Sequence, residues 1–70
     1  MLRIKQERLS RVNWTLDFVG EQLGLTGQAI SLIETGKRKP SFDVLVKLEN
    51  LFGLNYRDLF QDIPEDKSTA

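Results

Sequence analysis

One stretch, residues 16–36, limits what this 70-residue chain can fold into more than any other. Its apolar and small residues recur at i, i+3, i+4 and i+7, which predicts one buried face of a helix ending near Leu23. Gly24 follows directly, and glycine readily adopts the left-handed conformation that ends a helix. Thr26 then offers a hydroxyl that can cap a second helix, which we expect to stop at Gly36. The residues expected on the two buried faces are Leu16, Val19, Gly20, Leu23, Ala29, Ile30 and Ile33.

Two helices joined by a tight glycine turn form the plan of a helix-turn-helix. On a wheel with ~100° per residue, Ile30 and Ile33 share one side of the second helix, and a strip of different chemistry faces the other way. That strip comprises Gln28, Ser31, Leu32 and Thr35. A solvated face would usually carry Lys and Glu, whereas amide, hydroxyl and apolar groups suit the edges of base pairs. The alternative interpretation, a neutral surface helix without a binding role, stays open at this point.

The sequence on either side of this motif carries a family resemblance. After Gly20, Gly24, Ile30 and Ile33 come the stretches IETGKRKPS (residues 33–41) and LVKLENLFGLNYRDLF (residues 45–60). With these motifs the chain resembles the Cro/C1-type helix-turn-helix domains of phage repressors and related bacterial regulators, from about Ile4 to Phe60. The resemblance implies an all-α fold, a compact five-helix domain like that of the lambda repressor, which places its third helix in the DNA major groove. We therefore expect one helix-turn-helix domain over residues 1–60 and a flexible acidic tail over residues 61–70.

The helical wheel and the resemblance together predict the contacts with DNA. The residues expected to contact bases are Gln28, Ser31, Leu32 and Gly27. Gly27 has no side chain to read a base, but its small size would let the start of the helix approach the DNA closely. The residues expected to contact the DNA backbone are Thr15, Thr26, Thr35, Lys37, Arg38 and Lys39. The last three form a basic loop directly after the second helix, where a phosphate clamp is favoured over simple solvation of three cations.

Two further sets of contacts are implied by the resemblance. The family often pairs an arginine and a glutamate at the positions of Arg8 and Glu34, which would tie the first helix to the end of the recognition helix. A solvated surface arginine is the alternative, because most surface ion pairs contribute little. Repressors of this type also pair through their last helix, so a homodimer is implied. The residues expected at the dimer contact are Tyr56, Leu59 and Phe60.

The remaining elements follow from local patterns. Residues 2–12 are expected to form the first helix, with Leu9 and Val12 available for the core. Trp14 is expected to cover the core, and Thr15 to cap the next helix. Ser41 and Asn55 are the expected caps of the last two helices, and the apolar stripe between them is interpreted as core. Its members are Val44, Leu45, Leu48, Leu51 and Phe52.

Composition excludes several classes of function. The chain contains neither cysteine nor histidine, so disulfides and ordinary zinc sites are ruled out, and a hydrophobic core must stabilise the fold. Its longest apolar run, residues 44–46, is far shorter than the ~20 residues that span a bilayer. The N-terminus is charged from Arg3 on and lacks a signal-peptide core. We therefore expect a cytoplasmic protein with no metal, no cofactor, no membrane contact and no small-molecule substrate. Because the acidic residues make no paired site, we do not expect an enzyme.

The charge distribution bears on the remaining functions. Net charge is zero, but residues 1–40 hold seven basic and four acidic groups, and residues 41–70 hold three basic and six acidic groups. The helix-turn-helix half is therefore basic, although few phosphates can be neutralised. The leading interpretation is a sequence-specific DNA-binding transcriptional regulator, a repressor that binds a two-fold operator as a dimer. The alternative is an antitoxin-type or other protein-interaction module that uses the same fold.

Overall fold

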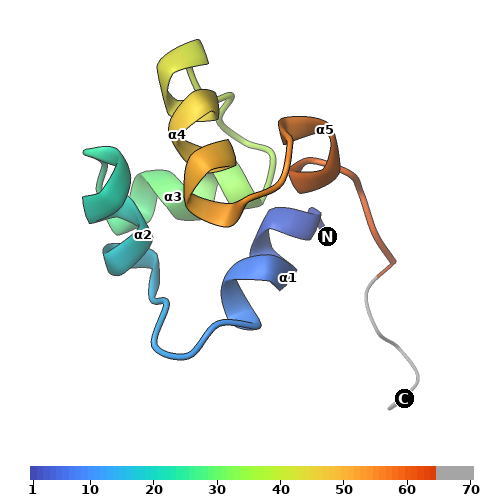
Figure 1. The fold of residues 1–70 in the computed structure, drawn as a ribbon, viewed down its shortest axis with the longest axis horizontal. Coiled ribbons are helices and arrows are strands. Elements are labelled where there is room, and N and C mark those ends of the chain that lie inside the picture. The colour runs from blue at the N-terminus through green and yellow to red at the C-terminus, as the bar shows by residue number, and fades with distance from the viewer. Residues whose placement is uncertain (65–70) are drawn as a thin grey trace.

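The computed structural model describes residues 1–64, and in that part of the chain five helices follow one another (Figure 1). They are α1 (Arg3–Leu9), α2 (Leu16–Leu23), α3 (Gly27–Glu34), α4 (Phe42–Phe52) and α5 (Tyr56–Leu59). α2 packs against both α3 and α4, and α5 packs against α1 and α4, which brings the two ends of the described chain together. The predicted all-α, five-helix domain is confirmed.

Side-chain caps begin four of these helices. In each, an oxygen of the capping side chain accepts a hydrogen bond of 3.0–3.3 Å from the backbone N–H three residues further on. The caps are Thr15, Thr26, Ser41 and Asn55. Each such cap satisfies an N–H group that the helix itself cannot, and contributes about 1 kcal/mol. All four caps were predicted from the sequence, so the starts of α2 to α5 are determined by local chemistry.

The core lies where the five helices meet. Its fully apolar members are Ile4, Val19, Leu23, Ile30, Ile33, Leu48, Phe52 and Leu59. Trp14 covers this core from the loop before α2, and its ring centroid lies 5.2 Å from Phe18 and 5.3 Å from Phe52. The predicted buried faces of α2 and α3 therefore converge on one cluster, with Trp14 in the covering position expected for it. From the predicted α4 stripe, Leu48 and Phe52 are buried there and Val44 and Leu51 pack half-buried against it, whereas Leu45 is half-buried and is not among these residues.

The first helix is shorter than predicted. α1 ends at Leu9 rather than near Val12, and the side chains of both residues are largely exposed, at 60% and 84%. The reason lies in Arg11, whose guanidinium donates to the carbonyl oxygens of Glu7 at 2.7 Å and Phe52 at 3.2 Å. It also lies 5.1 Å from the ring centroid of Trp14. Placing Arg11 between α1 and α4 turns the chain away from the helix, so the expectation that Leu9 and Val12 join the core is wrong.

Arg11 also belongs to a small charged group formed with two residues of α1. The carboxylate of Glu7 lies 3.1 Å from nitrogen atoms of both Arg11 and Arg3. The hydrogen bond from Arg11, assisted by Arg3, lowers the pKa of Glu7 below its ordinary value of 4.5, although partial burial works in the opposite direction. Glu7 is therefore protonated only at a lower pH than a glutamate without these partners.

The beginning of the predicted flexible tail is held in place. The Met1 ammonium lies 3.1 Å from Asp62 Oδ1, and the backbone N–H of Ile63 donates to the Met1 carbonyl at 2.8 Å. The N–H of Arg3 likewise donates to the Gln61 carbonyl at 2.9 Å. The expectation of a flexible tail is thus wrong for residues 61–63, because backbone hydrogen bonds join them to the first residues of the chain. Residues 65–70, the rest of that tail, lie outside the described residues.

Among residues 1–64, no helix combines the length and apolar composition needed to cross a bilayer. No cluster of acidic side chains with the arrangement of a metal site occurs in that range either.

Candidate nucleic-acid interface

The interface is built on the close packing of α2 and α3. Gly20 on α2 faces the turn between them: a Cβ there would press on the Leu25 carbonyl oxygen and lie 3.0 Å from the Thr26 carbonyl carbon. The Gly20 carbonyl accepts a hydrogen bond of 2.8 Å from the N–H of Leu25. Gly24 makes this turn possible, since its φ of 73° is a left-handed conformation that side chains disfavour. These residues fix α3 against α2 in the predicted helix-turn-helix arrangement.

The two faces of α3 differ as the sequence predicts. Its inner face buries Ala29, Ile30 and Ile33. On its outer face Gln28, Leu32 and Thr35 are exposed and Ser31 is half-buried. The strip predicted to meet base edges is therefore accessible at Gln28, Leu32 and Thr35 and partly accessible at Ser31.

The basic loop lies beside the C-terminal end of this strip. The N–H groups of Lys37 and Arg38 both donate to the Leu32 carbonyl, at 2.9 and 3.2 Å. These bonds satisfy a carbonyl that the end of the helix leaves free, and they hold the loop next to α3. Lys37, Arg38 and Lys39 are exposed, and within residues 1–64 none of the three takes part in an ion pair. Three cations thus stand free beside an exposed polar strip.

Three threonines were predicted to contact the DNA backbone. Thr15 and Thr26 are exposed and use their hydroxyl oxygens to accept hydrogen bonds as helix caps. The hydroxyl of Thr35 donates to the carbonyls of Ser31 and Leu32 at 3.1 Å. All three positions are accessible, and their contacts with DNA stay a prediction.

The predicted pair of Arg8 and Glu34 is present and buried. Arg8 Nε lies 2.7 Å from Glu34 Oε2, and a second guanidinium nitrogen lies 3.3 Å from Oε1. The third nitrogen donates to the Trp14 carbonyl at 3.1 Å. With side chains only 9% and 3% exposed, this two-pronged pair is part of the interior rather than a surface contact. It joins α1, the loop before α2 and the last residue of the recognition helix.

Comparison with known proteins agrees with this arrangement. A helix-turn-helix family model matches residues 4–59, which is most of the chain and spans the five helices except Arg3, the first residue of α1. The chain belongs to the Cro/C1-type helix-turn-helix family. No curated protein and no solved structure matched it.

Membership in the Cro/C1-type family makes the protein a DNA-binding transcription regulator, and this family is generally not enzymatic. DNA is accordingly its implied partner. Neither the operator nor the individual contact residues follow from membership, so the assigned roles of Gln28, Ser31, Leu32 and the basic loop stay predictions.

Gly27 differs from its expected setting. The sequence predicts Gly27 to be open, so that the start of α3 could approach DNA closely. The residue is instead buried, because the side chain of Asp17 covers it. A Cβ at residue 27 would collide with Asp17 Oδ1 and lie 3.2 Å from its Cγ. Asp17 itself is exposed, and the sequence analysis did not place it beside Gly27. The sequence does contain one indication of this contact. Gly27 follows a tight turn and has no side chain, so a residue of the neighbouring helix can fill the space beside it.

The predicted dimer residues are not equivalent. Leu59 is 0% exposed and belongs to the core of the monomer, so its assignment to a dimer surface is wrong. Phe60 is half-buried against the same core, and Tyr56 is 46% exposed. The physical reason is that α5 has only four residues and is anchored by its last one, Leu59. Of the three predicted dimer residues, Tyr56 and part of Phe60 remain available to a partner.

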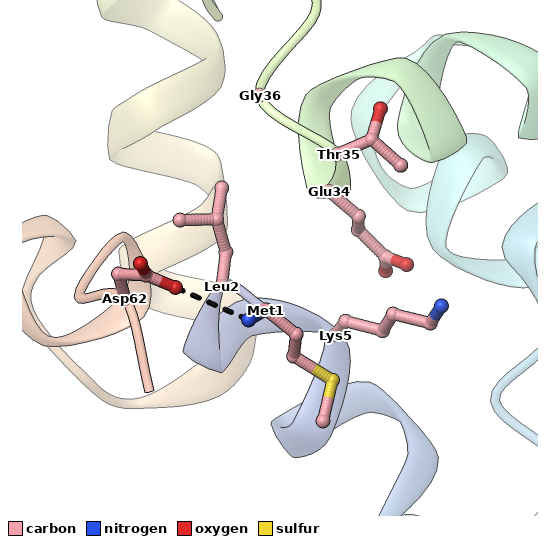
Figure 2. Close-up of a pocket in the computed structure, with 7 residues that line it drawn as sticks. All are labelled: Met1, Leu2, Lys5, Glu34, Thr35, Gly36 and Asp62. Carbon is pink, nitrogen blue, oxygen red and sulfur yellow. Dashed lines mark hydrogen bonds and ion pairs between the residues drawn. The ribbon is translucent and has the colours of Figure 1, made fainter. Parts of the chain in front are cut away.

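A pocket of about 470 Å³ lies between α1 and the end of α3. Figure 2 shows the Met1 amine directed at Asp62 on one side, while Lys5 extends away from this pair toward the α3 side. Both carboxylates of the pocket are engaged in ion pairs, Asp62 with the terminal amine and Glu34 with Arg8. We assign the pocket no binding role.

Proposed function

We propose that this regulator is a sequence-specific repressor that works in the cytoplasm and binds a two-fold operator as a homodimer. The observation that carries the proposal is the exposed strip of α3 beside three exposed cations, none of which is ion-paired within residues 1–64. Recognition helices of this class present their outer residues to base edges in the major groove, while flanking cations position the protein on the phosphates.

Direct readout is proposed for the exposed strip. The Gln28 amide can donate and accept at once, which suits the N6 and N7 atoms of adenine. Ser31 offers one hydroxyl, and the exposed Leu32 offers methyl groups that suit the C5-methyl of thymine. The half-buried state of Ser31 restricts its reach, so Gln28 and Leu32 are proposed as the principal base contacts.

Phosphate contacts are proposed for the basic loop. Lys37, Arg38 and Lys39 neutralise phosphates next to the recognition helix, and the backbone at the capped start of α2 adds N–H donors. Because each neutralised phosphate releases counterions, affinity should fall steeply with salt.

The experiment that tests this function is a selection from random duplex DNA, followed by gel shifts across a salt series. We expect an enriched motif with two related half-sites about one helical turn, or ~10 bp, apart. No sequence-selective binding at low salt would overturn the proposal. A single half-site with monomeric binding would overturn only the dimer.

The dimer is proposed to form through the exposed part of α5. Sedimentation of the wild type and of Tyr56→Ser tests this, since Tyr56 is the accessible aromatic residue there. Phe42→Ser is the matched control, because Phe42 is 77% exposed but lies at the start of α4. We expect Tyr56→Ser to shift the protein toward monomer and Phe42→Ser to leave the dimer intact. The reverse result would move the contact to α4.

A further inference from the structure

A carboxylate of α2 lies against the start of the recognition helix α3, and no role has yet been given to it. Gly27 is the first residue of α3 and has no side chain, yet the space where one would stand is occupied. A Cβ at this position would collide with Asp17 Oδ1 and lie 3.1 Å from the Asp17 backbone nitrogen. Gly27 is buried as a result, while Asp17 stays exposed. The carboxylate of α2 therefore replaces the missing side chain of α3.

The carboxylate lies at the edge of the predicted base-reading strip. On the wheel that places Ile30 at zero, Gly27 falls at roughly 60° and Ser31 at roughly 100°, so the two positions adjoin. The outward strip begins at Ser31 and continues through Thr35 and Gln28. A group that covers Gly27 thus extends this strip on the side facing α2. The N-terminal residues of a recognition helix are those that reach base edges, which puts the carboxylate where a base contact is made.

The local field favours a negative group at this place. The first N–H groups of α3 point toward its N-terminus, where the helix dipole is positive. The Thr26 hydroxyl satisfies the N–H of Ala29 at 3.1 Å, and a carboxylate beside Gly27 complements the positive end that remains. Asp17 consequently has a reason to stay against α3 rather than extend into solvent.

We propose that Asp17 is a specificity-determining residue that reads a base at the position residue 27 leaves vacant. This inference rests on the proposed function of sequence-specific binding. A carboxylate only accepts hydrogen bonds, so it favours the N4 amine of cytosine or the N6 amine of adenine, directly or through one water. It opposes guanine O6 and thymine O4, which are acceptors themselves.

A different effect must be separated from this one. Any acidic side chain near DNA repels phosphates and weakens binding to all sequences. Removing the charge of Asp17 will therefore raise general affinity whether or not Asp17 reads a base. Only a change of preference at one base pair distinguishes a contact from repulsion.

The test is a selection from random duplex DNA with wild type, Asp17→Asn and the control Glu21→Gln. Glu21 is also exposed on α2, one turn further along, and its variant removes the same charge without touching Gly27. We expect Asp17→Asn to change the preference at one base pair in each half-site by roughly fivefold or more, because the amide, unlike the carboxylate, also donates a hydrogen bond and so no longer opposes guanine O6 or thymine O4. Glu21→Gln should keep the wild-type motif. Identical motifs for the two variants would overturn the inference.

A second variant displaces the carboxylate without removing its charge. In Gly27→Ala the new methyl collides with Asp17 Oδ1, so the carboxylate must swing away from α3. The methyl also lies 3.1 Å from the Asp17 backbone nitrogen, so a melting curve accompanies this variant to show that the packing of α2 against α3 is kept. We expect loss of the same base preference with general affinity close to that of the wild type. An unchanged motif in a folded Gly27→Ala protein would contradict the assigned position. If the wild type itself selects no motif, the proposed function fails; if it selects one that both Asp17→Asn and Gly27→Ala keep, only this inference fails.

Discussion

Removing Arg8 should test the interior of the fold more severely than any surface change. Arg8→Ala leaves the Glu34 carboxylate buried at 3% exposure without its two guanidinium partners, and also frees the Trp14 carbonyl. Breaking one side of a buried pair costs roughly 3–5 kcal/mol. A 70-residue domain has a total stability of about 3.5–10 kcal/mol, so the variant loses a large part of it. At about 4 °C or more per kcal/mol, the melting temperature should fall by at least ~12 °C.

The assay is chemical and thermal denaturation followed by circular dichroism, with two comparison variants. Arg3→Ala removes an arginine from the same helix whose pair with Glu7 is partly exposed, and it should cost under about 1 kcal/mol. The double change Arg8→Met with Glu34→Leu replaces both charges by apolar groups and should recover most of the loss. A midpoint for Arg8→Ala equal to that of Arg3→Ala would refute the reasoning, as would a double variant less stable than Arg8→Ala.

Three further predictions concern recognition and pH. Gln28→Ala should lose about 1–3 kcal/mol of discrimination at one base pair, whereas Arg38→Ala should weaken all sequences alike and flatten the salt slope in gel shifts; equal weakening by both on specific and random DNA would show that Gln28 reads no base. Leu32→Ala should keep its melting temperature but bind the selected site less tightly, and replacing the contacted thymine by uracil should weaken the wild type while leaving the variant nearly unaffected; equal losses for both proteins would exclude the methyl contact. Arg11 and Arg3 lower the folded-state pKa of Glu7, so the stabilisation from the Glu7 carboxylate is present above the unfolded-state pKa and is lost as the pH falls through the lowered, folded-state pKa. The free energy of unfolding of Glu7→Gln should therefore decrease less steeply with falling pH than that of the wild type. Equal slopes for the two proteins in acid would contradict this prediction.

The parts of the fold that sequence reasoning predicts are those governed by local chemistry. Thr15 and Thr26 cap helices by bonding N–H groups three residues away, and Gly24 ends α2 through its own backbone preference. Ile30 and Ile33 share a face because of helix geometry alone. Each of these features depends on residues within one or two turns, so the sequence pattern is sufficient to place them.

The errors arise where distant segments compete with local preference. Val12 fits a continued helix, but Arg11 bonds the Phe52 carbonyl on α4 and draws the chain away. Leu59 was assigned to a partner surface, yet the short α5 uses it as an anchor in the monomer core. The tail was expected to be free from Gln61 on, but hydrogen bonds to the first residues hold its beginning. None of these contacts has a signature in the neighbouring sequence.

Gly27 and Asp17 illustrate why a recognition surface cannot be derived from one helix alone. In the sequence of α3, residue 27 is a glycine with no side chain, which suggests that the helix can approach DNA closely there. In the folded protein the side chain of Asp17, ten residues earlier in the chain, occupies the space beside Gly27, because the glycine turn brings α2 against the start of α3. Any side chain introduced at residue 27 would change two groups at once, its own and the carboxylate it displaces. Exchanging the outward residues of α3 for those of another regulator should therefore fail to transfer the full base preference unless residue 17 is exchanged with them.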